Sequence, residues 1–277
     1  MKLLILGATG FLGSTLFHLA GNRNLQVIGT SRYLNENRKI IEVDVTNKHA
    51  LKSTMESYDP DVVVWTLLSR ENEDVLIDHG LTNLLSIIKS ETKLIFLSTD
   101  AVFTGGKGGY KEADILNSLP NKAPLATYVN AKIRAERQIA ESHKNHTIIR
   151  TGPLYGMDAN GNIEARTQKM TRQLEQKGSV EAAADFYKTF VHIVDLSKAI
   201  LEFAFHDFKG VIHLGPAEKE SYFTFYKKRF ESLGFISGGI EPIEIADGKE
   251  NCLSVDTSLD TEKVRSMLKI SFRSLND

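Results

Sequence analysis

The chain has a single cysteine among its 277 residues, and this scarcity limits what the protein can be. One thiol cannot form a disulfide within the chain or build a cysteine-rich metal site. We therefore expect Cys252 to serve packing, in a reducing cytoplasmic environment. The histidines and carboxylates also lack metal-ligand spacing, so no metal site is predicted.

An excess of one charge sign is missing as well. The 34 basic and 35 acidic residues leave a formal net charge of -1, with no long block of either sign. Proteins that bind nucleic acid or an anionic membrane surface usually carry a basic patch or stripe. We therefore expect a small-molecule partner that is recognised locally, and neither nucleic acid nor membrane.

Long hydrophobic runs are absent too. No stretch approaches the roughly 18 consecutive apolar residues of a membrane span. The first apolar run covers about four residues before Gly7, which is shorter than the roughly 7 to 15 of a secretory signal. At the same time, 42% hydrophobic residues are enough to fill a substantial core, which is typical of a globular protein.

Short runs rich in Ile, Val and Leu recur along the first half of the chain, separated by segments with helical spacing. These runs are continuous rather than alternating, as expected of strands buried on both faces. Alternation of such strands with helices predicts an α/β fold, a doubly wound, Rossmann-like parallel sheet. The predicted strands are 2–6, 25–30, 39–43, 61–68, 93–98 and 146–150, and the predicted helices are 11–22, 47–57, 74–90 and 125–143.

The alternation of apolar strands with helices stops after about residue 151. From there, polar helices near 164–177 and 222–234 alternate with Gly-containing turns. Residues 195–205 and 210–215 still read as a helix and a strand of the main sheet. We therefore predict a dinucleotide-binding domain from 1–151 plus about 185–215. The remaining segments, 152–184 and 216–277, are predicted to form a smaller C-terminal substrate lobe.

A glycine-rich turn lies where the first strand passes into the first helix. The sequence GATGFLG spaces Gly7, Gly10 and Gly13 three residues apart. Such a turn lets the backbone approach a pyrophosphate, and the helix N-terminus offers it unpaired N–H groups. The alternative is a purely structural turn, but the strand before it and the helix after it favour dinucleotide binding.

The second strand ends in GTSRY, without the acidic residue that usually binds the ribose of NAD. Arg32, next to Ser31, is placed to pair with a 2′-phosphate, so NADP is favoured, with NAD still possible. A solvated surface arginine is the alternative. Asp44, after the third strand, is expected near the adenine or next to a helix N-cap.

The fifth strand ends in Ser98, Thr99 and Asp100, at the edge where ligands bind in open parallel sheets. The next predicted helix carries Tyr128 and Lys132, four residues apart on one face. An ammonium beside a phenol lowers the phenol pKa and helps it exchange protons, as reduction of a ketone requires. The alternatives are a polar turn and an ordinary helix surface, but these do not account for the three features together.

Seven motifs now point to one family: GATGFLG, LSTDAVFTG, YVNAK, IIRTGPLYG, TFVHIVDLSKAI, GVIHLG and the closing SVDTSLDTEKV. Over nearly its whole length the chain resembles the extended short-chain dehydrogenase/reductases, and most of all the dTDP-4-dehydrorhamnose reductase family of sugar-nucleotide reductases. The resemblance implies an NAD(P)-dependent oxidoreductase acting on a nucleotide-linked sugar. It implies Thr99, Tyr128 and Lys132 as the catalytic triad, in which Tyr128 is the acid and Lys132 also holds the nicotinamide ribose.

The complete set of expected site residues extends beyond this triad. Expected to bind the cofactor are Gly7, Thr9, Gly10, Phe11, Leu12, Gly13, Ser31, Arg32, Asp44, Val45, Thr66, Leu67, Ser98, Tyr128, Lys132 and Pro153. Expected to bind substrate are Asp100, Val102, Phe103, Tyr155 and His192, although packing under the sheet is the favoured interpretation of His192. Arg150 is expected to line the nicotinamide pocket through its backbone.

Three residues depart from the family pattern. Leu67 and Leu68 stand after the fourth strand, where relatives usually have small residues. Ala101 replaces the usual Tyr after Ser-Thr-Asp, and it occupies the Glu position of the sugar-nucleotide dehydratases, which argues against dehydration.

The alternatives to a reductase are an NAD-dependent sugar-nucleotide epimerase and a catalytically silent NADP-binding regulatory protein. The sequence leaves a homodimer possible.

Overall fold

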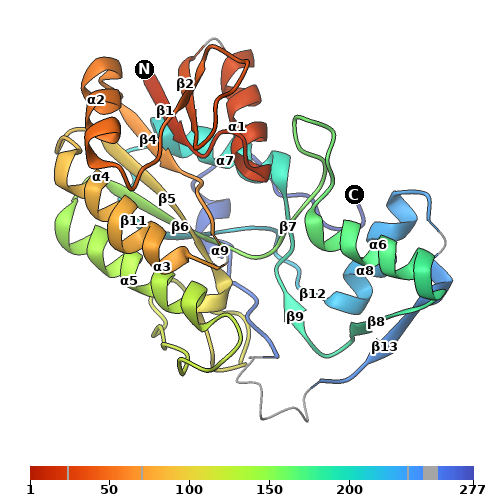
Figure 1. Ribbon diagram of the computed structural model, residues 1–277. Coiled ribbons are helices and arrows are strands. Elements are labelled where there is room, and N and C mark those ends of the chain that lie inside the picture. Colours follow the sequence, from red (N-terminus) through yellow and green to blue (C-terminus); the bar gives the residue numbers. More distant parts are fainter. Residues whose placement is uncertain (24, 70, 236, 246–254) are drawn as a thin grey trace.

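The computed structural model describes residues 1–277 except 24, 70, 236 and 246–254 (Figure 1). Cys252, expected to serve packing, lies outside the described residues. Within them, no helix combines the length and the apolar character that crossing a membrane requires.

The core of the fold is a seven-stranded sheet with the strand order β11-β6-β5-β4-β1-β2-β3, in which every neighbouring pair is parallel. This order confirms the predicted doubly wound, Rossmann-like fold class. The strands run as follows: β1 (Lys2–Leu6), β2 (Gln26–Ser31), β3 (Ile40–Glu42), β4 (Val62–Trp65), β5 (Lys93–Thr99), β6 (His146–Thr151) and β11 (Gly210–Leu214).

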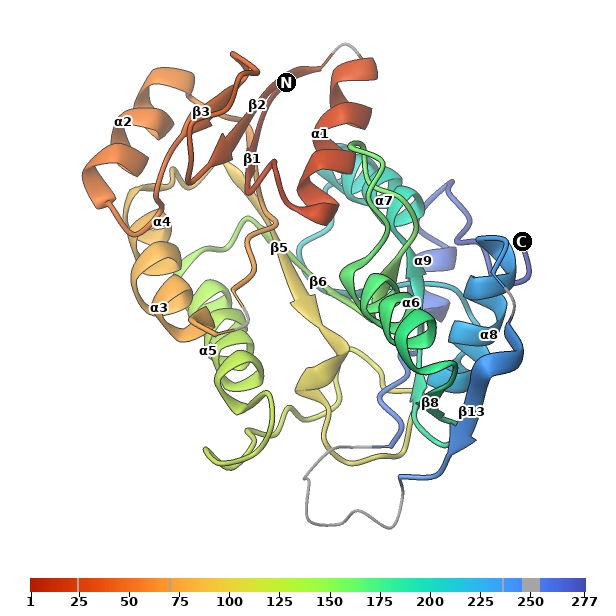
Figure 2. The same ribbon diagram turned by 45° about the vertical axis from the view of Figure 1, so that its right-hand side comes forward.

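Helices cover both faces of the sheet (Figures 1 and 2). Helices α1 (Phe11–Asn22) and α7 (Ile193–Phe205) share one apolar cluster with Leu3 and Ile5 of β1. On the other face, α2 (Lys48–Tyr58), α4 (Thr82–Ile87) and α5 (Ala126–Ser142) share a second cluster with Leu4 and Leu6. Because successive β1 side chains enter opposite clusters, the continuous apolar run is explained by burial on both faces.

Two predicted elements differ from the structure. Strand β4 ends at Trp65 rather than at residue 68, because the Thr66 hydroxyl donates hydrogen bonds to the Leu6 and Gly7 carbonyls at 2.8 and 3.3 Å and draws the chain toward β1. The predicted helix 74–90 is three segments: α3 (Glu73–Val75), a π-helical turn η1 (Leu76–Leu81) and α4, which ends at Ile87.

A smaller lobe lies beside one end of the sheet (Figure 2). Helices α6 (Ala165–Lys177) and α8 (Tyr222–Ser232) lie there with the parallel strands β8 (Val180–Ala183) and β13 (Ile240–Ile243). Its apolar cluster is separate from those of the sheet and includes Phe190 and Phe225, whose rings stack with centroids 4.0 Å apart. The domain boundaries given above stay a prediction.

Short elements connect the two parts. The pairs are β7 (Leu154–Tyr155) with β10 (Val191–His192), and β9 (Tyr187–Lys188) with β12 (Glu220–Ser221). The remaining short elements are the 3-10 turns η2 (Asp100–Val102) and η3 (Ser237–Gly239), and α9 (Glu262–Arg265). Strand β9 also reaches Asp256 through an isolated bridge from Tyr187, so the C-terminal segment returns toward the end of β5.

Candidate functional site

The turn between β1 and α1 has the geometry that its glycines suggest. Gly7 has a φ of +93°, a conformation that favours residues without a Cβ. A Cβ on Gly13 would lie 2.0 Å from the Gly7 carbonyl oxygen, so the helix packs this closely on the turn only with glycine there. Helix α1 begins after Gly10 without a side-chain cap. Its first amides are therefore available to an anion.

The side chains around this turn are those predicted to bind the cofactor. Thr9 donates a 3.4 Å hydrogen bond to the Ser31 hydroxyl, which also accepts one from the Tyr33 amide. Partial burial raises the pKa of Asp44, but the Thr46 amide and hydroxyl and the Arg32 charge lower it overall. Arg32 and Asp44 are both exposed and lie within electrostatic range of each other, at the ends of β2 and β3.

The segment after β4 covers the turn. Leu67 lies directly over Gly7, because a Cβ built on Gly7 would be 2.9 Å from Leu67 Cδ2. Leu68 is exposed, and Leu12 and Val45 are buried. The bulk of Leu67 therefore lies against the backbone of the predicted phosphate site, whereas Leu68 does not fill it.

Thr99 ends β5 and caps the short turn η2. Its hydroxyl accepts a hydrogen bond from the Ala101 amide and donates one to Asp100 Oδ1, each 3.2 Å long. The other Asp100 oxygen pairs with the Lys188 ammonium at 2.9 Å and accepts a hydrogen bond from Thr257. Asp100 is buried, so this predicted substrate ligand is committed to the interior of the protein.

Ser98 and Arg150 belong to a second buried network. The Ser98 hydroxyl donates to Glu136 Oε1, and Arg150 pairs with Glu136 at 2.6 Å. Arg150 also donates to the Glu112 carbonyl at 3.1 Å and lies beside the ring of His213. The network joins the ends of β5, β6 and β11 to α5, and the side chain of Ser98 faces it.

Tyr128 and Lys132 lie in the first half of α5, with the Lys132 ammonium 5.9 Å from the centre of the Tyr128 ring. The ammonium also lies 4.7 Å from the centre of the Phe96 ring and donates a 3.1 Å hydrogen bond to the Leu97 carbonyl. Lys132 is 2% exposed. The structure thus places the Lys132 ammonium between α5 and β5, on the same side of α5 as Tyr128 four residues earlier.

The partner of Lys132 was not predicted from the sequence. Glu73, at the start of α3, places its Oε1 2.9 Å from the Lys132 ammonium, and its exposed fraction is 0%. Its other oxygen accepts a 2.6 Å hydrogen bond from the Ser69 amide. In the sequence, Glu73 is one acidic residue of the polar stretch ENED, and nothing in that pattern separates it from its neighbours.

The remaining predicted residues are dispersed. Val102 and Phe103 pack in the core, where Phe103 stacks on Tyr110 with ring centroids 4.3 Å apart. Pro153 is half-buried, and its carbonyl accepts a hydrogen bond from the Val191 amide. Tyr155 is buried in the smaller lobe and contacts the ring of His192 edge to face, with centroids 5.1 Å apart.

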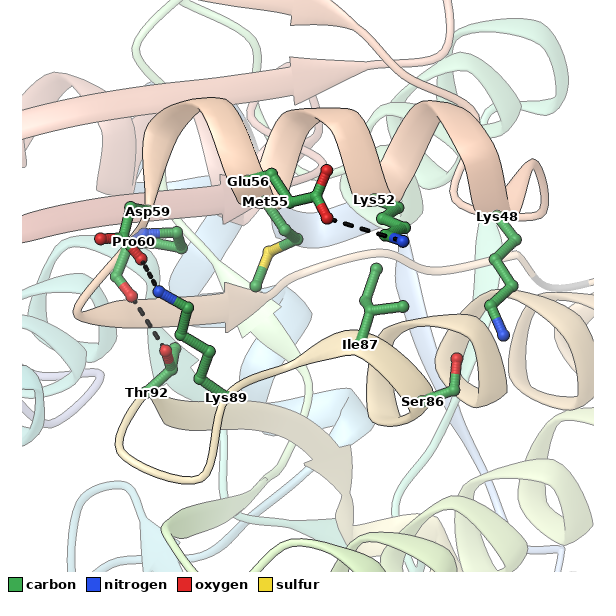
Figure 3. Close-up of a pocket in the computed structure, with 10 residues that line it drawn as sticks. All are labelled: Lys48, Lys52, Met55, Glu56, Asp59, Pro60, Ser86, Ile87, Lys89 and Thr92. Carbon is green, nitrogen blue, oxygen red and sulfur yellow. Dashed lines mark hydrogen bonds and ion pairs between the residues drawn. The ribbon is translucent and has the colours of Figure 1, made fainter.

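A hollow of about 280 Å³ lies elsewhere, between α2 and α4 (Figure 3). It adjoins Pro60 and Thr92, which come just before β4 and β5, at the edge of the sheet opposite to Gly7 and Thr99. Two of its three lysines form ion pairs with nearby carboxylates: Lys52 with Glu56 at 3.6 Å, and Lys89 with Asp59 at 2.6 Å. None of the predicted site residues lines this hollow. The candidate site is therefore the region at the carboxyl ends of strands β1, β4 and β5.

Comparison with known proteins places this geometry in a family. The sequence model described as "RmlD substrate binding domain" matches residues 1–276, which confirms the family resemblance stated from the motifs. The chain is 25% identical over 252 residues to dTDP-4-keto-6-deoxy-D-glucose reductase of Streptomyces niveus, covering 87% of this chain and 81% of that protein.

A second relative has a different name. Methionine adenosyltransferase 2 subunit beta of Xenopus tropicalis is 26% identical over 165 residues, covering 56% of this chain. The chain spans only 47% of the length of that protein.

Solved structures share the fold over the whole chain. A dTDP-4-dehydrorhamnose reductase of Bacillus anthracis in complex with NADP superposes with a TM-score of 0.81 at 21% identity, covering 99% of this chain and 96% of that one. A hypothetical dTDP-4-dehydrorhamnose reductase of Sulfolobus tokodaii gives 0.77 at 25% identity, covering 100% and 98%.

Proposed function

Because the chain belongs to the RmlD substrate binding domain family, we propose that it is an NADPH-dependent reductase of a keto group on a nucleotide-linked sugar. The observation that carries the proposal is that three groups lie together at the carboxyl ends of the sheet strands. The glycine turn of Gly7 and Gly13, the Thr99 hydroxyl and the Tyr128–Lys132 pair all lie where β1 and β5 end or on the helix packed beside them.

The residues of the β1–α1 turn fit a dinucleotide. The missing Cβ of Gly13 lets α1 pack closely on the turn, and the uncapped start of α1 leaves backbone amides that a pyrophosphate can approach. Arg32 is exposed and ready to pair with a 2′-phosphate, and this favours NADPH over NADH. When bound, the cofactor supplies the hydride for the carbonyl carbon.

The chain's own residues handle the proton. Tyr128 donates its phenolic proton to the carbonyl oxygen, and the Lys132 ammonium favours the phenolate that remains. The Thr99 hydroxyl, which donates to Asp100 in the structure, turns about its Cβ–Oγ bond to donate to the same carbonyl oxygen. Ala101 leaves no carboxylate at the next position, so these residues provide an acid but no second base of the dehydratase type.

The test is the Tyr128→Phe variant with a panel of keto-sugar nucleotides, followed through NADPH absorbance. We expect turnover to fall by about 10²-fold or more, since loss of a general acid has that size, while NADPH affinity changes little. The wild-type protein is the reference, and NADPH fluorescence reports binding independently of turnover. Turnover of the variant close to that of the wild type would contradict the role of Tyr128.

One observation favours a second candidate, a catalytically silent NADP-binding protein. The Lys132 charge is already paired with Glu73 inside the protein, and Ala101 places only a methyl group two residues after Thr99. One relative, methionine adenosyltransferase 2 subunit beta, is named as a subunit and not as a reductase. NADPH binding without turnover on the whole panel, unchanged by Tyr128→Phe, would favour this candidate over the reductase.

A further inference from the structure

The pairing of Lys132 with Glu73 adds a residue to the site. Glu73 and Lys132 come from different elements, the start of α3 and the middle of α5, and both are almost completely buried. A charge removed from water in this way needs a partner at short range, and each is the partner of the other. Glu73 therefore belongs to the surroundings of the lysine on which the proposed chemistry depends.

The ion pair with Glu73 does not engage all N–H donors of the Lys132 ammonium. Lysine has three N–H donors, and one is directed to the Leu97 carbonyl at 3.1 Å. A second acceptor, Glu73 Oε1, lies 2.9 Å from the ammonium nitrogen. The Leu97 carbonyl and Glu73 together account for two of the three donors, so one N–H remains for another acceptor.

Glu73 is also tied to the segment that covers the cofactor turn. The Ser69 amide donates to Glu73 Oε2 at 2.6 Å. A few residues earlier, the Thr66 hydroxyl donates to the Leu6 and Gly7 carbonyls, and Leu67 lies over Gly7. One continuous segment thus contacts the predicted phosphate turn at its start and the lysine at its end.

We propose that Glu73 is a positioning residue that acts on cofactor binding through Lys132. Its carboxylate accepts a hydrogen bond from the Ser69 amide and holds the Lys132 ammonium between Phe96 and Tyr128. There, the remaining N–H donor of Lys132 can bind the ribose of the cofactor. The inference rests on the proposed function, because it takes from that function the binding of NADPH near Lys132.

The test is a double-mutant cycle on NADPH affinity, measured by fluorescence with the full chain. The proteins are wild type, Glu73→Gln, Lys132→Met and the double variant. We expect Glu73→Gln to raise the Kd for NADPH by about tenfold in the wild-type background, and to have no further effect when Lys132 is already Met. Glu71→Gln is the matched control, because Glu71 is an exposed carboxylate of the same stretch.

The cycle separates positioning from a merely structural role. An equal loss of affinity in both backgrounds, or a tighter Kd in Glu73→Gln, would overturn the proposal. Glu73→Asp keeps the charge on a shorter side chain and should give an intermediate Kd, and it replaces Glu73→Gln in the cycle if circular dichroism shows that the latter does not fold. NADPH binding without turnover on the substrate panel removes the reductase and leaves this inference standing, whereas no NADPH binding by the wild type overturns both.

Discussion

Burial shifts the pKa values of His192 and Tyr155 in the directions that favour their neutral forms. Burial, reinforced by the positive charge of Arg273, lowers the pKa of His192 to about 4. Burial raises the pKa of Tyr155 to about 12. The two rings are in edge-to-face contact, and His192 Nδ1 accepts from the Val194 amide as the N-cap of α7. His192 thus caps α7 as a neutral ring.

The lowered pKa of His192 predicts how this residue affects stability with pH. Its pKa in the unfolded chain is near the ordinary 6.5, so between about pH 4 and 6.5 the unfolded state binds more protons than the folded state. The contribution of His192 to stability is therefore present above about pH 6.5 and is lost as the pH falls toward 4. We expect an NMR titration to show the His192 ring unprotonated at pH 5.5, and a stability curve of His192→Gln that is flatter across this window.

Two kinds of residue differ in how far the sequence predicts them. Gly7 and Gly13 are accessible from the sequence because their requirement is local, a positive φ and a close backbone contact at one turn. Glu73 is not, because its partner lies on another helix and only folding brings the two together. Asp100 was predicted at the right edge of the sheet, but its pairing with Lys188 depends on a segment much later in the chain.

The attachment of α5 to the sheet is the main feature at the scale of elements. Glu136, on the same helix as Tyr128 and Lys132, accepts from Ser98 of β5 and pairs with Arg150 of β6. Both partners of the Glu136–Arg150 pair are buried, with side-chain exposures of 5% and 4%. These bonds fix the helix at the point where its first half faces the ends of the strands.

Breaking this pair should be costly. We expect Arg150→Met to lower the free energy of unfolding by about 3–5 kcal/mol, because it leaves the Glu136 carboxylate buried without its cation. Arg134→Met is the matched control, since Arg134 of α5 forms a surface pair with Asp78 of η1, with exposures of 46% and 53%, and such pairs contribute about 0–1 kcal/mol. Chemical denaturation measures both. Equal effects of the two substitutions on the free energy of unfolding would contradict a special stabilising role of the Glu136–Arg150 pair.

Element types were easier to predict than the turns within them. The apolar runs located all six early strands because complete burial leaves a continuous hydrophobic signal. The π-helical turn η1 was missed, since one extra residue per turn hardly alters apolar spacing. The turn packs closely on its surroundings, because a Cβ on Gly80 would meet Val45 Cγ2 at 2.7 Å. Strands β8 and β13 were missed because each has only four residues, with polar ones among them.

At the scale of the whole molecule, the end of β5 is linked to segments far along the chain. Asp100 pairs with Lys188 of β9 and accepts from Thr257, which is 157 residues away. Lys188 also donates to Thr257, so the three side chains form a closed buried group. The residue next to Asp100 is Thr99, whose hydroxyl bonds to the free oxygen of the same carboxylate. The position of the proposed catalytic hydroxyl therefore depends on how the C-terminal segment packs.

This dependence predicts a separation of binding from turnover. We expect Lys188→Met to reduce kcat by about tenfold or more, because Asp100 loses its cation and the turn that positions the Thr99 hydroxyl is held less firmly. The NADPH affinity should stay within about twofold, since the β1–α1 turn and Lys132 make no contact with this group in the described residues. Lys228→Met, which removes a partly exposed pair with Glu220, is the control for general destabilisation of the same region.

The outcome of the Lys188 experiment decides between two ways in which the C-terminal segment could serve the site. If kcat falls while NADPH affinity holds, the segment acts on the chemistry through Asp100 and Thr99, as the hydrogen bonds indicate. If affinity and kcat fall together, and Lys228→Met does the same, the segment acts only by keeping the chain folded. The first result would extend the working site from the sheet edge to residues near position 257, which lie outside the glycine-rich turn and α5 from which the function was first inferred.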